Sequence, residues 1–286
     1  MNERFIFDAH VHVWADDRLA YPQVPGLERP ESHRGSADWL IELMDASGVS
    51  GALLVQTPWY AEDNGYFVDT LKRFPGRFVA LGYLPEPLAP DAPEKLARQY
   101  HVDGFRGVRI HLVQPEIIAG VADGKADPLI RQAGALGVPV QFLNRVPEQH
   151  ALILDLARHF PNVRFINDHL GHPRIGEGYP YHASQTFFDC GRLPNVYAKV
   201  SLHHQLSQTG YPWIDLEDFQ KLTLDAYGAH KLLWGSNFPM AMPDPTYQQR
   251  LDVALTGLPF LTDEERNWIL GKTARTLWGE DNGNLP

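Results

Sequence analysis

Two histidines separated by one residue, His10 and His12, end the first apolar run of the chain. Side chains on a β-strand alternate between its two faces, so both rings would point the same way, about 6–7 Å apart along the strand. Two imidazoles that converge in this way suit a divalent metal ion or a pair of proton-handling groups. The pair therefore marks the first place to look for catalytic chemistry.

A third histidine, His169, and the amide Asn237 end two later apolar runs. If the runs are parallel strands, their carboxyl ends meet at one edge, and His169 would join the first pair with Asp168 as its hydrogen-bond partner. A metal-assisted hydrolase would be expected to carry a carboxylate, as ligand or general base, where Asn237 stands. The predicted catalytic residues are His10, His12, His169 and Asn237, and the three histidines are also the predicted metal ligands.

Other polar and aromatic residues at the ends of these runs are candidates for substrate binding. An arginine at a strand end suits two-point recognition of a carboxylate, although a structural ion pair is an equally open interpretation of Arg109. Lys199 could anchor a carboxylate or be a salt-bridged strand residue, and Trp59 with its neighbour could wall a pocket or pack a loop. The predicted set is Arg109, His111, Gln56, Trp59, Tyr60, Gln141, Lys199 and His203.

Eight strand-like runs position these residues, and helical patterns lie between them. The spacing of roughly 25–45 residues favours a parallel sheet with crossover helices, and eight units favour a closed barrel over a doubly wound sheet. Because no segment resembles a linker, we predict one α/β domain over residues 1–286, a (β/α)8 TIM barrel. The runs are Phe5–Val13, Gly51–Thr57, Phe78–Leu84, Phe105–Leu112, Val138–Asn144, Val163–Leu170, Val196–His203 and Leu232–Phe238.

Two of the helical patterns carry recognisable start signals. Ser36 stands where it could cap a helix that begins near Asp38 and is closed by Gly48. Thr262 and Glu265 have the spacing of a capping box.

Composition excludes several classes of partner. The formal net charge is −10 and no long Lys/Arg run occurs, so neither nucleic acid nor an anionic membrane is expected as a partner. No dinucleotide-binding or P-loop glycine motif is present.

Met1–Arg4 is too short for a signal peptide, and Cys190 is the single cysteine, so we expect a cytoplasmic protein. A small-molecule substrate is the expected partner, and a homo-oligomer is compatible with the sequence.

Four segments resemble the amidohydrolase superfamily, specifically its amidohydrolase 2 branch, which contains lactonases and, more distantly, metal-dependent decarboxylases. They are Asp8–His12, Gly104–Arg109, Asp168–Pro173 and Trp234–Pro239, in the order and on the strands where the branch has them. The resemblance implies a distorted (β/α)8 barrel. It also implies that histidines of strands one and six polarise a lactone carbonyl, that arginines grip substrate carboxylates, and that a strand-eight aspartate activates water. In the lactonases the metal is often dispensable.

The chain departs from the family pattern at two strands. The fifth run, Val138–Asn144, has no histidine, so the metal set of the decarboxylases is incomplete and the lactonase pattern fits better. Asn237 stands in place of the strand-eight aspartate, and an amide cannot accept a proton at neutral pH. Three explanations stay open: an engineered Asp→Asn variant, a natural variant with another base such as His169, His12 or a metal-bound water, or a degenerate member that only binds.

These observations together predict a hydrolase that opens the lactone ring of a small carboxylated metabolite. The expected cofactor is one divalent ion, zinc or manganese, and metal-independent catalysis is the alternative. Two other functions stay open at this point: a metal-dependent decarboxylase of an aromatic or muconate-type acid, and a non-catalytic member of the family.

Overall fold

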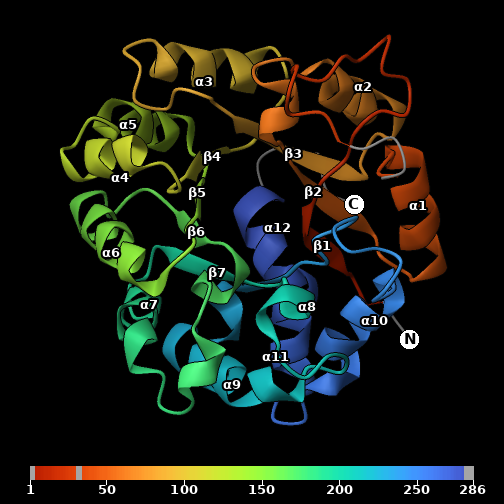
Figure 1. Ribbon diagram of the computed structural model, residues 1–286, viewed down its shortest axis with the longest axis vertical. Coiled ribbons are helices and arrows are strands. Elements are labelled where there is room, and N and C mark those ends of the chain that lie inside the picture. The colour runs from red at the N-terminus through yellow and green to blue at the C-terminus, as the bar shows by residue number, and fades with distance from the viewer. Residues whose placement is uncertain (1–3, 30–33, 280–286) are drawn as a thin grey trace.

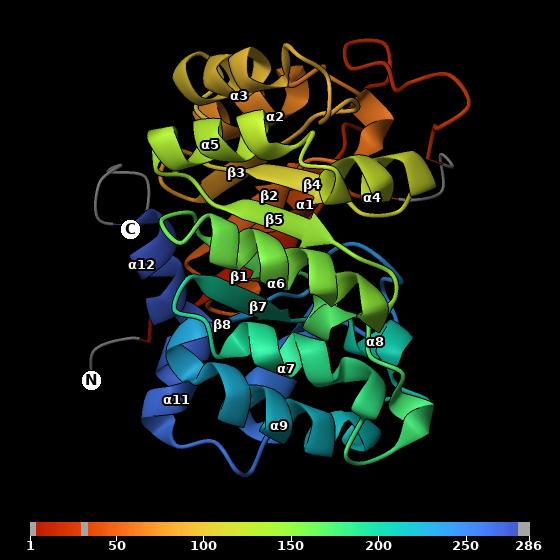
Figure 2. The same cartoon turned by 90° about the vertical axis from the view of Figure 1, so that its left-hand side faces the viewer.

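A computed structural model describes residues 4–29 and 34–279, which form a barrel of eight parallel strands ringed by helices (Figures 1 and 2). Each strand pairs with the next in chain order, which confirms the predicted (β/α)8 barrel. The extent of the domain from residue 1 to residue 286 stays a prediction, because Met1–Glu3 and the last seven residues lie outside the described part. The strands are β1 Phe7–Val11, β2 Gly51–Val55, β3 Phe78–Tyr83, β4 Val108–His111, β5 Val140–Leu143, β6 Phe165–Asn167, β7 Val196–Val200 and β8 Leu232–Trp234.

The barrel closes between its first and last strands through a short contact. Val11 forms a parallel bridge with Phe238, and the His12 backbone N–H donates to the Phe238 carbonyl at 2.7 Å. Closure therefore depends on the segment that follows β8, the same segment that carries Asn237.

Every observed strand is shorter than the run that predicted it: β4 and β5 begin three and two residues later, whereas β7 and β8 end three and four residues earlier. Strand β7 ends at Val200, and Leu202 then adopts a left-handed φ of 65° that starts the short helix α8. His203 consequently lies in α8, and the strand alternation that placed it beside Lys199 no longer applies.

Helices follow the strands around the outside of the barrel. Thr262 and Glu265 form the predicted capping box of α11, whereas the Ser36 side chain makes no capping bond at the start of α1. The helices are α1 Ala37–Ala46, α2 Gly65–Arg73, α3 Ala92–His101, α4 Pro115–Ala122, α5 Asp127–Leu136, α6 His150–His159, α7 Gln185–Gly191, α8 His203–Leu206, α9 Glu217–Tyr227, α10 Tyr247–Asp252, α11 Asp263–Asn267 and α12 Thr273–Trp278.

The last helix, α12, closes the amino-terminal end of the barrel and lies at its centre in Figure 1. Leu277 and Trp278 join an apolar cluster with strand residues such as Phe7, and the Trp278 Nε1–H donates to the carbonyl of Arg106, just before β4. Because this end is sealed by apolar side chains, the opposite end is left for polar chemistry, as in other barrels of this type. None of the described helices has the length and apolar character needed to cross a membrane.

Candidate active site

The predicted histidine pair converges at the carboxyl end of β1. The Nε2 atoms of His10 and His12 lie 3.2 Å apart, and both rings are buried. His12 Nδ1 lies 2.8 Å from the carbonyl oxygen of Val55. A carbonyl oxygen only accepts, so His12 carries its proton on Nδ1 and presents an Nε2 lone pair.

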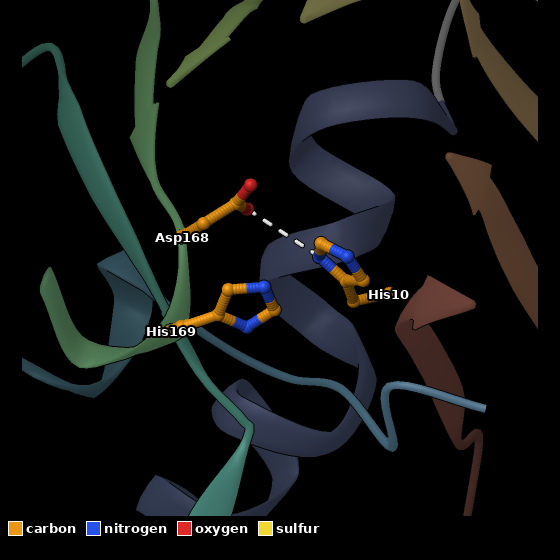
Figure 3. A group of neighbouring side chains, drawn as sticks. All are labelled: His10, Asp168 and His169. Atoms are coloured by element: carbon orange, nitrogen blue, oxygen red, sulfur yellow. Dashed lines mark ion pairs between the residues drawn. The ribbon is translucent and has the colours of Figure 1, made fainter. Parts of the chain in front are cut away.

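Asp168 is the anionic centre of the site and collects donors from two neighbouring strands. Its Oδ2 accepts from Arg109 Nε at 2.9 Å and from Gln141 Nε2 at 2.9 Å, and Arg109 also reaches it through a terminal nitrogen at 2.7 Å. Its Oδ1 faces His10 Nδ1 at 3.4 Å, the contact drawn in Figure 3. Burial alone would raise the pKa of Asp168, but the charges of Arg109 and Lys199 hold that pKa well below its ordinary value.

Lys199 is a salt-bridged residue of β7, which resolves the two interpretations left open by the sequence. Its side chain is fully buried; Nζ lies 3.3 Å from His10 Nδ1 and 3.6 Å from Asp168 Oδ1, and donates to the Gln141 side-chain oxygen. Burial lowers the pKa of Lys199 to about 7. Lys199 and Gln141 thus contact His10 and Asp168 and do not line the cavity.

His169 joins the cluster through an unusual turn after β6. His169 and Leu170 both have left-handed φ angles, 54° and 53°, which swing the His169 ring to a centroid distance of 4.5 Å from His10. His169 Nδ1 lies 2.9 Å from Ser201 Oγ, which orients the ring. Among the described residues, His10, Asp168 and His169 form a group whose possible ligand atoms all lie within 4.8 Å of one another. Asp168 thus takes the place that the sequence assigned to His12 in a three-residue metal set.

The geometry of these residues fits a divalent ion. Two ligand atoms bound at about 2.1 Å to one ion lie about 3.0 Å apart at a right angle and about 3.4 Å apart at the tetrahedral angle, and His10 Nδ1 lies 3.4 Å from Asp168 Oδ1. The Nδ1 atom of His169 already has a partner of the kind that orients metal ligands. Asp168 Oδ1 has no hydrogen-bond donor among the described residues. The buried cluster can therefore hold a metal.

Asn237 lies beside His10 in a backbone conformation that suits asparagine. Its φ is 59°, a left-handed value that asparagine tolerates better than most residues, and its backbone N–H donates to the His10 carbonyl at 2.8 Å. The preceding residue, Ser236, donates its N–H to Asp8, and Arg250 donates to the Ser236 carbonyl. These contacts fix Asn237 at the seam between β1 and β8.

A cavity of about 400 Å³ opens above the cluster. Its size suits a small metabolite. Six of the residues predicted for the site line it: His12, Trp59, Arg109, His111, His169 and Asn237. Among its described lining residues there are two arginines and four histidines but no aspartate or glutamate.

Three residues predicted to bind substrate lie among packing contacts instead of on the cavity wall. Gln56 donates to Asp63 and Asn64, so its amide ties together the loop after β2. The Tyr60 hydroxyl accepts the backbone N–H of Ala15. His203 stacks on Trp213, with Nε2 3.1 Å from Gln220 Oε1.

Sequence reasoning missed five polar or charged residues of the cavity, and the two ionisable ones are Arg145 and His172. Both lie just beyond a strand end, where strand alternation no longer says which way a side chain points. The available signal was their type and place: His172 falls inside the Asp168–Pro173 segment, and Arg145 directly follows the fifth run.

The chain belongs to the amidohydrolase family, whose pattern it matches over residues 7–279. It is 28% identical over 246 residues to L-fucono-1,5-lactonase of Burkholderia ambifaria, covering 83% of this chain and 81% of that protein. It is 23% identical over 279 residues to 4-sulfomuconolactone hydrolase of Hydrogenophaga intermedia, covering 96% of this chain and 88% of that protein. The fold is similar to that of a Burkholderia multivorans amidohydrolase with bound zinc, with a TM-score of 0.78 and 21% sequence identity. The match covers 99% of this chain and 100% of that chain. Family membership suggests a hydrolase.

Proposed function

We propose that this protein hydrolyses the lactone ring of a small carboxylated metabolite. One observation carries the proposal: a buried cluster of convergent imidazoles lies below a cavity that is rich in arginine and histidine and has no carboxylate among its described lining residues. Two relatives are lactone hydrolases, which supports the same class of reaction.

In the proposed reaction a water oxygen adds to the lactone carbonyl carbon, the bond from that carbon to the ring oxygen breaks, and the ring oxygen takes up a proton. The Asn237 amide can donate to or accept from the water and so orient it, but cannot remove its proton. Burial lowers the pKa of His12 to about 3, so its Nε2 lone pair is free at neutral pH. His12, a cavity-lining imidazole beside the cluster, is the proposed proton acceptor, and His169 takes that role in the metal-independent alternative.

The proposal includes one divalent ion, zinc or manganese, as cofactor. His10, Asp168 and His169 would hold it, and it would polarise the substrate carbonyl. Elemental analysis of the purified protein and titration of the apoprotein with zinc should give one ion per chain. The variant His10→Ala should lose that ion, and the exposed His159→Ala should keep it. Absence of any binding would favour the metal-independent alternative.

The test of the function is ring opening of L-fucono-1,5-lactone and of 4-sulfomuconolactone, followed by acid release. We expect the wild-type chain, supplied with zinc or manganese, to open at least one of them. An absence of ring opening with both lactones, together with release of CO2 from an aromatic acid, would replace the proposal by the decarboxylase alternative.

The variant Asn237→Asp tests how the missing carboxylate is replaced. If water is activated by a histidine or by a metal, as proposed, the variant should change turnover by less than about tenfold. A lost general base costs about 10²–10⁴ in rate. A gain of that size would instead identify the chain as a hydrolase disabled at residue 237.

A further inference from the structure

The arginine that the sequence assigned to substrate recognition is already engaged. Arg109 reaches Asp168 through Nε at 2.9 Å and through a terminal nitrogen at 2.7 Å, and both side chains are buried. An ion pair this close largely neutralises the arginine charge in a low-dielectric interior. An acidic group on the substrate would therefore be bound more strongly by a cation that has no such partner.

Arg145 is that cation. It lines the cavity just after β5, and its guanidinium pairs with no carboxylate in the described part of the chain. Its backbone N–H donates to Gln149 Oε1 at 2.8 Å, which holds the loop in place. Nearby, Glu148 is already paired with Arg174 at 2.6 Å, so Arg145 keeps its charge uncompensated.

Two histidines beside this arginine offer further unused polar atoms to the cavity. Within the described residues, neither ring nitrogen of His172 has a hydrogen-bond partner, nor does Nε2 of His111, although all three atoms are buried. Buried polar atoms are rarely left unpaired unless a water or a ligand pairs with them. Both rings also lie close enough to Arg145 for its charge to reinforce the effect of burial in lowering their pKa values.

We propose that Arg145, His172 and His111 form a subsite for the acidic group of the substrate, at a distance from the carbonyl that reacts. This inference rests on the proposed function and names the residues that would bind the acidic group of its substrate, a carboxylate or a sulfonate. The two lactone-hydrolysing relatives act on lactones of opposite kinds, a neutral sugar lactone and an anionic sulfonated one. The proposed subsite favours an anionic lactone as the substrate of this chain.

The kinetic test compares Arg145→Gln with wild type on 4-sulfomuconolactone and on L-fucono-1,5-lactone. A hydrogen bond to a charged group contributes about 1.5–3 kcal/mol, so the variant should raise KM for 4-sulfomuconolactone about 10- to 150-fold. Its kcat, and both constants for the neutral lactone, should change less than about threefold. Arg145→Lys should recover part of the loss. Arg158→Gln, which removes the same charge from an exposed position on α6, should behave like wild type.

A binding test separates this inference from the lactonase proposal. Isothermal titration calorimetry with benzene-1,3-dicarboxylate should give binding to wild type that weakens at least tenfold in Arg145→Gln, whereas the neutral benzene-1,3-dicarboxamide should not distinguish the two proteins. Arginine-dependent binding without any lactone hydrolysis would support the subsite and overturn the lactonase. Absence of binding to wild type, or equal binding to both proteins, would overturn the subsite even if lactones are hydrolysed.

Discussion

At the scale of single residues, tautomers and partners decide what the histidines can do. The Val55 carbonyl forces the His12 proton onto Nδ1, whereas Ser201 Oγ can either donate to or accept from His169. His12 therefore presents a lone pair at Nε2, whereas His169 can present either a lone pair or an N–H at Nε2. The residue types alone did not contain this distinction.

Removal of the His169 ring should lower turnover while leaving the fold intact. His169→Ala takes away one of the two imidazoles that line the cavity above the cluster, so kcat on a hydrolysed lactone should fall at least about tenfold. Circular dichroism and thermal melting should resemble wild type. The control is His159→Ala, at the exposed end of α6. Unchanged turnover in His169→Ala would return this residue to a structural role.

At the scale of elements, one buried cluster connects five of the eight strands. Residues of β1, β4, β5 and β7 contact Asp168, which directly follows β6: His10, Arg109, Gln141 and Lys199. The barrel interior at this level is thus held together by an ionic network instead of apolar layers. Such a network is sensitive to loss of one member, because the remaining charges stay buried.

The variant Arg109→Leu should therefore destabilise the barrel strongly. It leaves Asp168 with fewer donors in a fully buried position, and the loss of one partner of a buried ion pair costs about 3–5 kcal/mol. Urea unfolding at pH 7.5 should show a drop of that size in the free energy of unfolding. The matched control, Arg73→Leu, removes an exposed ion pair with Asp38 and should cost far less. Equal effects of the two variants would contradict the role given to the network.

At the scale of the whole molecule, buried neutral histidines outside the active site link stability to pH. Burial lowers the pKa of His150 and of His203 to about 4. In the unfolded chain these rings titrate near their ordinary pKa of about 6.5. Their contribution to stability is therefore complete above about pH 6.5 and is lost as the pH falls toward 4, because the unfolded state then binds the proton more tightly.

Protonation of each ring should lower the free energy of unfolding by about 2 kcal/mol when the pH falls from 7.5 to 5. Urea unfolding of wild type at the two pH values measures the combined loss. The variant His150→Asn keeps a donor for the Pro147 carbonyl, to which His150 Nδ1 is bound at 2.8 Å, but does not titrate. It should reduce the loss by one ring's share, whereas His101→Asn, at an exposed position in α3, should not. An unchanged pH dependence in His150→Asn would show that this ring does not couple folding to protonation.

The sequence by itself determined the barrel, the order of its strands and the His10/His12 pair. These follow from local patterns: apolar runs of strand length, helices between them, and a two-residue spacing that places two rings on one face. The same rule failed at His203, where Leu202 turns the chain out of β7. Strand alternation did not predict the direction of the Arg145 side chain, because Arg145 lies beyond the end of β5.

Only the tertiary structure decided which charged residues pair with one another and which stay available to a ligand. Arg109 and Asp168 are 59 positions apart in the chain, and β5 separates their strands in the sheet. Their pairing, which makes the predicted substrate-binding arginine part of the interior network, depends on both side chains entering the barrel interior. The choice of Arg145 over Arg109 as the free cation follows from that pairing. Periodicity acts over a few residues, whereas the charge that a side chain presents to a ligand depends on every neighbour that folding brings within a few ångströms.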